Sequence, residues 1–99
     1  MFFWICNFCN LFDGKIPTEI GLLTEMTDLS LDLNEFIEGS IPEEIGSLSK
    51  LERLRLSDMA LSGPIPSSFG NLVNLVDLYL QNNNLKGSLP RELKNLVNL

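Results

Sequence analysis

The sequence predicts an α/β solenoid, a fold in which a short strand and a short helical turn form a coil that repeats along the chain. Three observations carry this prediction. Glycine and proline recur at nearly constant intervals, the 99 residues include 20 leucines and 10 asparagines, and leucine alternates with polar residues at matching places in successive intervals. A composition this narrow and periodic is typical of stacked repeats rather than of one irregular core.

Glycine and proline set the length of the repeat. One glycine series is separated by 25, 24 and 24 residues, and a proline follows each of its members three residues later. A second glycine series is separated by 25 and 24 residues, with Lys94 at the next place. Because the two series use all 7 glycines, none is left for a phosphate-binding loop. The members are Gly14, Gly39, Gly63 and Gly87, then Pro17, Pro42, Pro66 and Pro90, and finally Gly21, Gly46 and Gly70.

Each repeat is expected to start with a short strand. Leucine occupies alternate positions at 29 and 31, at 54 and 56, and at 78 and 80, which is the period-two pattern of a strand with one buried face. A lone strand cannot bury its leucines, so the strands must pair side by side in a parallel sheet over a shared interior. The residues between the leucines then point outward.

The second half of each repeat is expected to turn. Glycine permits backbone angles that are closed to other residues, and proline suits the first position of a helix but not its interior. After each proline the apolar residues have helical spacing, as in residues 66–75, over a length that allows a turn or two of 3₁₀ or α helix. Glu43 and Glu44 follow Pro42 at such a start, where the helix dipole stabilises carboxylates.

The most complete unit reads Leu75-x-x-Leu78-x-Leu80-x-x-Asn83-x-Leu85-x-Gly87-x-Leu89-Pro90, and earlier copies start at Leu51 and Met26. These units resemble plant-type leucine-rich repeats, as in receptor-like kinase ectodomains and polygalacturonase-inhibiting proteins. The resemblance covers residues 10–99, about three full repeats with partial ends. Residues 1–9 form a degenerate N-terminal segment in which Ile5 matches Leu78 in register. The resemblance implies a right-handed superhelix with a parallel sheet on the concave face and short 3₁₀ or α turns on the convex face.

The resemblance also assigns a role to the asparagines that follow the strands. In this family the asparagine points inward and hydrogen-bonds backbone groups that the turn would leave unsatisfied. Asn10, Asn34 and Asn83 occupy this position, whereas Met59 replaces the asparagine in one repeat. We therefore expect a defect at the Met59 turn, with backbone groups bonded to water or left without a partner. A second short strand at the Gly-x-Ile-Pro segment is implied in addition.

Proteins of this family usually bind partners on the concave face, so the outward strand residues form the candidate partner-binding site. When the strands are aligned, Arg53 falls between Asp28 and Asp77. One interpretation is charge pairing on a solvated surface, which contributes a fraction of a kcal/mol. The other is a ligand patch anchored by Arg55 and Tyr79, because these residue types are enriched at binding hot spots. The candidates are Asp28, Ser30, Asp32, Arg53, Arg55, Ser57, Asp77, Tyr79 and Gln81.

The composition argues against catalysis, cofactors and nucleic-acid binding. The chain has no histidine, which removes histidine-based nucleophile pairs and metal sites, and its net charge of −6 disfavours nucleic acid. Cys6 and Cys9 form a lone Cys-x-x-Cys without further zinc ligands, and we expect ordinary thiols. The apolar residues 1–6 are too few for a signal peptide or a membrane span. No catalytic, cofactor-binding or metal-binding residue is expected.

The expected function is that of a non-catalytic module for a protein or peptide ligand, within a fragment of a longer receptor-like or extracellular protein. Two alternatives stay open: a scaffold without a dedicated ligand, and an ectodomain piece of a receptor-like serine/threonine kinase whose kinase domain lies outside this chain. The compartment of the chain is unknown, and the resemblance places a full-length parent outside the cell or at its surface. Uncapped solenoid ends would expose apolar interior, so we expect marginal stability or self-association through these ends.

Overall fold

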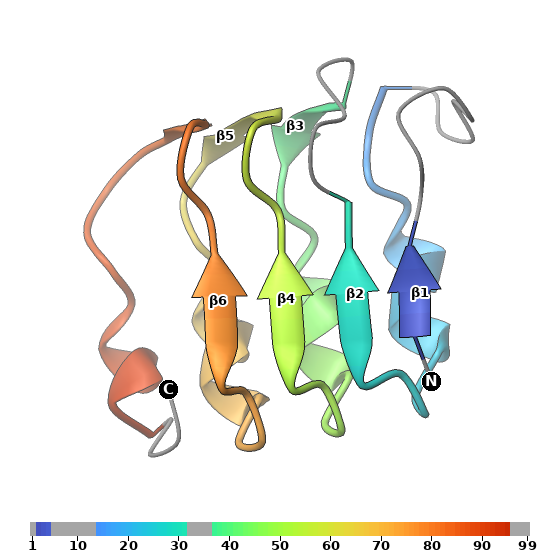
Figure 1. Ribbon diagram of the computed structural model, residues 1–99. Coiled ribbons are helices and arrows are strands. Elements are labelled where there is room, and N and C mark those ends of the chain that lie inside the picture. Colours follow the sequence, from blue (N-terminus) through green and yellow to red (C-terminus); the bar gives the residue numbers. More distant parts are fainter. Residues whose placement is uncertain (1, 5–13, 32–36, 96–99) are drawn as a thin grey trace.

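Each repeat forms one flattened coil, and the coils stack side by side (Figure 1). In this computed structural model the described residues are 2–4, 14–31 and 37–95. A full repeat comprises a strand of the main sheet, a second strand on the flank and a 3₁₀ turn. The elements are β1 (Phe2–Trp4), η1 (Thr18–Leu22), β2 (Asp28–Ser30), β3 (Glu38–Ser40), η2 (Glu43–Ser47), β4 (Arg53–Arg55), β5 (Ala60–Gly63), η3 (Ser67–Asn71), β6 (Asp77–Tyr79), β7 (Asn84–Leu85) and η4 (Arg91–Asn95).

The strands form two parallel sheets. The main sheet has the order β1-β2-β4-β6, and the second sheet has the order β3-β5-β7. In the main sheet Leu29, Leu54 and Leu78 are aligned in register, so the strands predicted from the leucine alternation are confirmed. The second sheet confirms a short flanking strand in each full repeat, although these strands lie before or around the glycine rather than along the whole Gly-x-Ile-Pro segment that the family resemblance implies. Every helical turn in the described part is a five-residue 3₁₀ turn; η1, η2 and η3 lie behind the main sheet in Figure 1, and η4 lies beside β6.

The N-terminal residues join the main sheet in a register that differs from the expected one. β1 pairs with β2, and Phe3 aligns with Leu29 and hence with Leu54 and Leu78. The expected match of Ile5 with Leu78 is therefore wrong. The cause is the spacing in the first unit, where the strand is farther from its glycine, Gly14, than in the later repeats. The division of the chain at residue 9 stays a prediction, because residues 5–13 lie outside the described residues.

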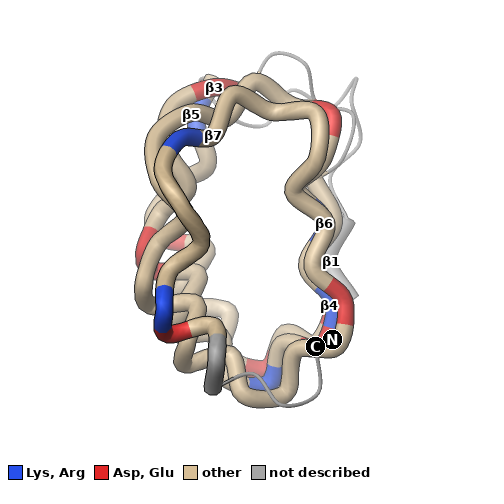
Figure 2. The backbone as a smooth tube through the Cα atoms, turned by 90° about the vertical axis from the view of Figure 1, so that its left-hand side faces the viewer, with Lys and Arg blue, Asp and Glu red and all other residues tan. Residues whose placement is uncertain are grey.

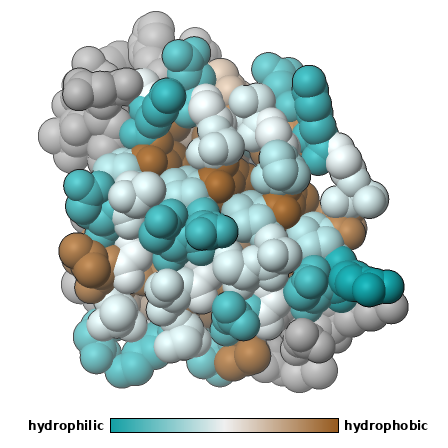
Figure 3. All heavy atoms as spheres, turned by 180° about the vertical axis from the view of Figure 1, so that it is seen from behind, coloured by the Kyte–Doolittle hydropathy of each residue, from teal (hydrophilic) through white to brown (hydrophobic). Residues whose placement is uncertain are grey.

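The apolar residues of successive coils make one continuous core. Leu54, Leu56, Leu61 and Phe69 of the middle repeat are all 0% exposed. Because burying a side chain of this size contributes about 1.5–3 kcal/mol, the core is the main source of stability. Seen along the stack, the coils superpose, and Lys, Arg, Asp and Glu lie on the outline of the coil (Figure 2). The back of the molecule shows apolar atoms only in small areas between polar ones (Figure 3).

The second glycine series lies where neighbouring 3₁₀ turns approach most closely. A Cβ on Gly46 would lie 2.5 Å from the Cβ of Ser68, and a Cβ on Gly70 would lie 2.6 Å from the Cβ of Glu92. Carbon atoms in contact are about 3.5–4.0 Å apart, so a side chain at these positions would force the turns apart. The first series has another cause: Gly63 has φ 76°, a left-handed conformation that favours glycine.

The asparagine after β6, the fourth strand of the main sheet, bonds the turn of the preceding coil. The Asn83 Oδ1 accepts the Leu61 N–H at 3.1 Å, and the Asn83 Nδ2 donates to the Leu56 carbonyl at 2.7 Å. The Nδ2 also lies 3.1 Å from the carbonyl of Leu80 in its own coil. We expected backbone groups at the Met59 turn to lack protein partners. This expectation is wrong for the Leu61 N–H and the Leu56 carbonyl, because Asn83 of the following coil bonds both. Met59 itself is buried in the core.

The two ends of the stack differ in the burial of equivalent apolar positions. Ile16, Ile20 and Met26 near the N-terminal end are 5%, 4% and 0% exposed. Leu89, which is equivalent to Ile16 in the last coil, is 68% exposed. The expectation that the array exposes apolar interior at its ends therefore fits the C-terminal end and is wrong for these N-terminal positions.

Candidate functional site

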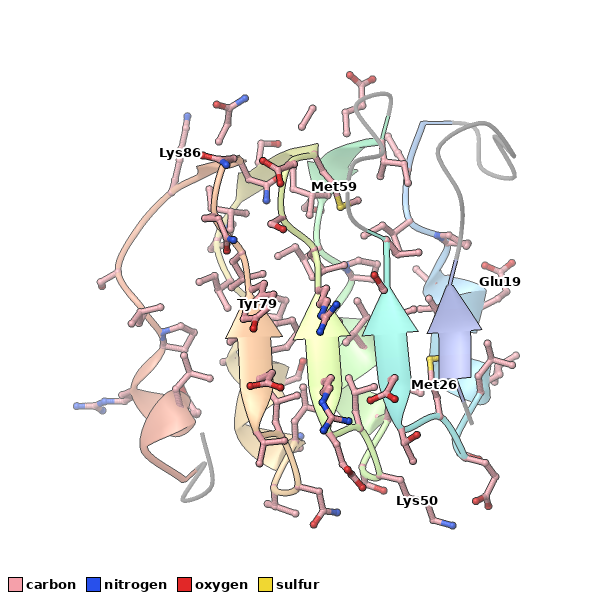
Figure 4. The ribbon with its side chains drawn as sticks, viewed as in Figure 1. Glu19, Met26, Lys50, Met59, Tyr79 and Lys86 are labelled. Carbon is pink, nitrogen blue, oxygen red and sulfur yellow. The ribbon has the colours of Figure 1, made fainter. Side chains whose placement is uncertain are left out.

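The outer face of the main sheet is built from alternate residues of three neighbouring strands. Residues that alternate with the leucines of β2, β4 and β6 project from this face, and Figure 4 shows Tyr79 among them on β6. The parallel register aligns them in rows across the sheet. The first row holds Asp28, Arg53 and Asp77, and the second holds Ser30, Arg55 and Tyr79.

Arg53 is paired with carboxylates on both sides. Its Nη1 lies 3.4 Å from the Asp28 Oδ1, and its Nε lies 3.2 Å from the Asp77 Oδ2. These are the neighbours expected from the alignment of the strands, so the predicted charge pairing is confirmed. The Arg53 side chain is 48% exposed, and exposed ion pairs contribute about 0.2–1 kcal/mol each. The first row is therefore a solvated charge cluster whose cation already has partners.

Arg55 has a different environment from Arg53. Its Cζ lies 5.4 Å from the centroid of the Tyr79 ring, close enough for a cation–π interaction. Arg55 forms no ion pair with the described residues. Both side chains are exposed, Tyr79 at 40%. The second row thus presents a cation and an aromatic ring side by side, with the guanidinium open to a further negatively charged group.

Two of the predicted face residues are buried. Ser30 is 7% exposed and Ser57 is 4% exposed, so the expectation that both are open to a partner is wrong. Ser30 lies on the face, but its short side chain is aligned beside the long Arg55. Ser57 follows the end of β4, where Asp58 takes a left-handed φ of 56° and the outward alternation no longer applies.

The last row of the predicted face is only partly described. Gln81 is exposed and lies beyond the end of β6, and its carbonyl accepts the Asp58 N–H at 3.0 Å. Asp32 lies outside the described residues. The described face that remains open to a partner therefore consists of Asp28, Arg53, Arg55, Asp77, Tyr79 and Gln81.

The sequence interpretation missed an exposed apolar residue next to this face. Val76 directly precedes β6 and is 40% exposed. The sequence contains a signal for its exposure: the equivalent positions in the earlier repeats hold Thr27 and Glu52, which are polar and therefore indicate a surface position.

Two features are absent from the described part of the chain: a cluster of metal-ligating side chains and a membrane-spanning helix. None of its His, Cys, Asp and Glu side chains form a group of three able to hold a metal ion. Likewise, none of its helices is long and apolar enough to span a bilayer. Cys6 and Cys9, expected to be ordinary thiols, lie outside the described residues.

Known proteins with the same repeats include plant receptor ectodomains. The Leucine Rich Repeat family model matches residues 50–72 and 74–96. The receptor kinase SOBIR1 ectodomain from Arabidopsis thaliana is 40% identical with a TM-score of 0.80, covering 86% of this chain and 45% of that one. A plant ice-binding protein is 42% identical with a TM-score of 0.83, covering 87% of this chain and 28% of that one.

A third similar structure is a receptor complex. The Arabidopsis receptor kinase HAESA, solved with the peptide hormone IDA and the co-receptor SERK1, is 34% identical with a TM-score of 0.81. The match covers 86% of this chain and 14% of that one. The chain thus spans less than half the length of these structures, and a comparison with curated proteins finds no match. By its repeats, its two parallel sheets and these similarities, the chain is a leucine-rich repeat protein of the plant type.

Proposed function

We propose that this chain is a non-catalytic module that binds a protein or peptide on the outer face of its main sheet. The observation that carries the proposal is the contrast between the two arginines of β4. Arg53 has a carboxylate on each side, whereas Arg55 has an aromatic neighbour and no carboxylate among the described residues. We therefore expect an acidic group of a partner to gain the most binding free energy at the cluster of Arg55 and Tyr79.

The physical case rests on desolvation and rigidity. Tyr79 is an amphipathic side chain with few rotatable bonds, and it holds the Arg55 guanidinium in place before a partner arrives. An incoming carboxylate can then form a charge-assisted pair with Arg55 at a small cost in side-chain entropy. The HAESA structure, solved with a peptide hormone, supports a peptide as the class of ligand.

The test uses random peptides displayed on phage and selected on the immobilised 99-residue chain. We expect the selected peptides to be rich in Asp or Glu. Binding of a selected peptide should weaken about tenfold in Arg55→Ala and in Tyr79→Ala, the effect expected of hot-spot residues. Arg91→Ala is the matched control, since Arg91 is an exposed arginine on η4. Circular dichroism of each variant checks that the fold is retained.

Two results would contradict this proposal. Selection without enriched peptides would favour the alternative of a scaffold without a dedicated ligand. Equal losses in Arg55→Ala and Arg91→Ala would show that the chain binds through its overall charge rather than through the Arg55 cluster. The net charge of −6 makes nucleic acid an unfavourable partner in either case.

The same similarities support a proposal for the setting of the module. We propose that residues 10–99 form one repeat array, that the array is a right-handed superhelix with the main sheet on its concave face, and that a longer parent protein places it outside the cell or at its surface. The similar SOBIR1 structure is the ectodomain of a receptor kinase, which supports this location.

A further inference from the structure

The outer face of the main sheet changes the sign of its charge along the strands. Its first row holds the carboxylates of Asp28 and Asp77 and the guanidinium of Arg53, so one negative charge is in excess. Glu52 directly precedes β4, is exposed and forms no ion pair with the described residues. The second row holds the Arg55 guanidinium and no carboxylate. The face is thus negative where the strands begin and positive one row further along.

The two aspartates of the first row can accept further hydrogen bonds. Asp28 contacts Arg53 through Oδ1, and Asp77 contacts it through Oδ2. The second oxygen of each carboxylate forms no ion pair with the described residues, although a carboxylate accepts several hydrogen bonds on its two oxygens. The Asp28 side chain is 26% exposed and that of Asp77 is 40% exposed. A cation of a partner can therefore bind here without displacing Arg53.

The same two ion pairs prevent Arg53 from serving a second anion. Its Nη1 faces the Asp28 carboxylate and its Nε faces the Asp77 carboxylate. An acidic group that approached the first row would meet both carboxylates and would have to displace one of them from Arg53. Like charges at such short distances repel each other, so the first row rejects an acidic group that the second row accepts.

Neighbouring coils do not cover this face. β2 and β6 lie on either side of β4 in the sheet, and Figure 1 shows no described element in front of these strands. The middle strand thus has a coil on both sides, yet the Arg53 side chain is 48% exposed. The open surface is a property of the outer side of the sheet and does not depend on either end of the stack.

The opposite side of Arg55 offers less to a cation. The next alternate residue along β4 is Ser57, which is 4% exposed. Asp58 follows it beyond the strand, and its Oδ1 already accepts the Asn82 Nδ2 at 2.6 Å. The carboxylates that suit a cation of a partner are therefore those of the first row, on the other side of Arg55.

We propose that the partner is an extended peptide in which a basic residue lies two positions from the acidic one. This inference rests on the proposed binding of an acidic residue at Arg55. Alternate residues of an extended chain lie on one side, about 6.5–7 Å apart, in the peptide as in β4. A peptide that lies along β4 with its acidic residue at Arg55 therefore places a residue two positions away over Asp28 and Asp77. Lys or Arg at this position pairs with the two carboxylates, whereas Asp or Glu is repelled.

The experiment is a competition among phage-displayed peptides on the immobilised 99-residue chain. Every peptide carries Asp at one fixed position and Lys, Ala or Glu two residues to either side of it, with random flanks. We expect Lys to be enriched over Ala by about threefold to tenfold, and Glu to be depleted, the effect of two exposed charge pairs. In Asp28→Asn/Asp77→Asn the order should reverse, with Glu above Lys, because Arg53 then lacks its carboxylates and can bind a second acidic residue.

The matched control is Asp58→Asn/Glu43→Gln, which removes the same charge from other places. Glu43 is exposed on η2, and asparagine tolerates the left-handed conformation of residue 58. This variant should keep the preference for Lys. Both double variants should keep the circular dichroism spectrum of the parent, since they remove only exposed or half-exposed charges.

The outcomes separate this proposal from that of the Arg55 cluster. If no peptide is enriched over selection on Arg55→Ala, both proposals fail. Equal enrichment of Lys, Ala and Glu peptides that is lost in Arg55→Ala leaves the proposed function standing and overturns the charge order. A preference for Lys that both double variants reduce equally reflects overall charge and overturns it as well.

Discussion

Single side chains join each coil to the one before it. The Lys50 ammonium pairs with Glu25, the Ser68 Oγ donates to the Glu43 carbonyl at 2.7 Å, and the Asn74 Nδ2 donates to the Ser49 carbonyl at 2.9 Å. These contacts are exposed, so water can replace them at little cost. Asn83 differs because it is half-buried and bonds backbone groups that water cannot easily reach. We therefore expect Asn83 to contribute more to stability than the other connecting side chains.

Replacing Asn83 with Ala should lower the free energy of unfolding by about 1–3 kcal/mol, the cost of leaving buried polar groups without partners. The groups are the Leu56 carbonyl and the Leu61 N–H. Asn74→Ala removes the exposed hydrogen bond to the Ser49 carbonyl and should change the free energy of unfolding by less than about 0.5 kcal/mol. Urea denaturation measures both values. Equal effects would show that burial of the asparagine is not what matters.

The Glu25 carboxylate should titrate below its usual range. The hydrogen bond from Lys50 and the Lys50 charge lower the pKa of Glu25 from 4.5. Because the folded-state pKa lies below the unfolded one, this pair favours the folded state above the unfolded pKa, and its effect is lost as pH falls through the folded value. Both side chains are exposed, at 56% and 72%, so the effect on stability is small.

Titration by carboxyl-carbon NMR measures this shift directly. Lys50→Ala should return the midpoint of Glu25 toward 4.5. The matched control is Lys86→Ala, which removes an exposed lysine of another coil and should leave the midpoint unchanged. A Glu25 midpoint that does not move in Lys50→Ala would exclude the pair in solution.

Among the elements, the 3₁₀ turns depend most on small residues. η2 and η3 meet at Gly46, where a Cβ would lie 2.5 Å from both the Cβ and the Oγ of Ser68. A Cβ on Gly87 would meet no atom within 4 Å, although its φ of 78° disfavours other residues. The two glycines are thus required for different reasons, one for space and one for backbone conformation.

A double-mutant cycle separates these reasons. Gly46→Ala should destabilise the fold by about 1–3 kcal/mol through overpacking, and adding Ser68→Gly should restore part of this loss. Gly87→Ala should cost about 1–3 kcal/mol through strain, and Ser68→Gly should add to it without rescue. Ser68→Gly alone completes both cycles, because it also removes the hydrogen bond from the Ser68 Oγ to the Glu43 carbonyl. Thermal unfolding monitored by circular dichroism gives the stabilities of all five variants. Rescue of both alanine variants, or of neither, would contradict the assignment.

The strands show how much of the fold could be predicted from the sequence. β2, β4 and β6 lie where leucine alternates with polar residues, because burial of one face enforces that pattern. The register predicted for β1 is wrong because its unit lacks the leucines that mark the later strands, and because its strand is farther from the following glycine than in the later repeats. The ion pairs of Arg53 could be predicted because the leucine pattern aligns β2, β4 and β6. The burial of Ser57 could not be predicted, because it depends on where β4 ends and the chain turns.

The direction of the asparagine contacts could not be read from the sequence either. Spacing alone places Met59 and Asn83 at the same position of successive repeats. Which turn each side chain bonds depends on the distance between neighbouring coils, which only the three-dimensional structure gives. In the structure Asn83 bonds the turn of the preceding coil as well as the Leu80 carbonyl of its own coil.

For the molecule as a whole, local stability should fall toward the C-terminal end. Leu54, Leu56, Leu61 and Phe69 of the middle coil are 0% exposed, while Leu78, Leu80, Leu85 and Leu93 of the last coil are only partly buried. In dilute solution, native-state hydrogen exchange should therefore be fastest in β7 and η4 and slowest in β4. Uniform protection along the described strands would show that the chain opens only as one unit.

The backward reach of Asn83 also bears on how the chain is made. Its side chain completes the hydrogen bonds of the turn between Leu56 and Leu61. During synthesis from the N-terminus, this turn cannot gain those bonds until residue 83 has left the ribosome. The folding of this coil therefore lags one repeat behind its translation. If translation pauses between the two repeats, the earlier coil lacks the hydrogen bonds from Asn83 until the next repeat is made.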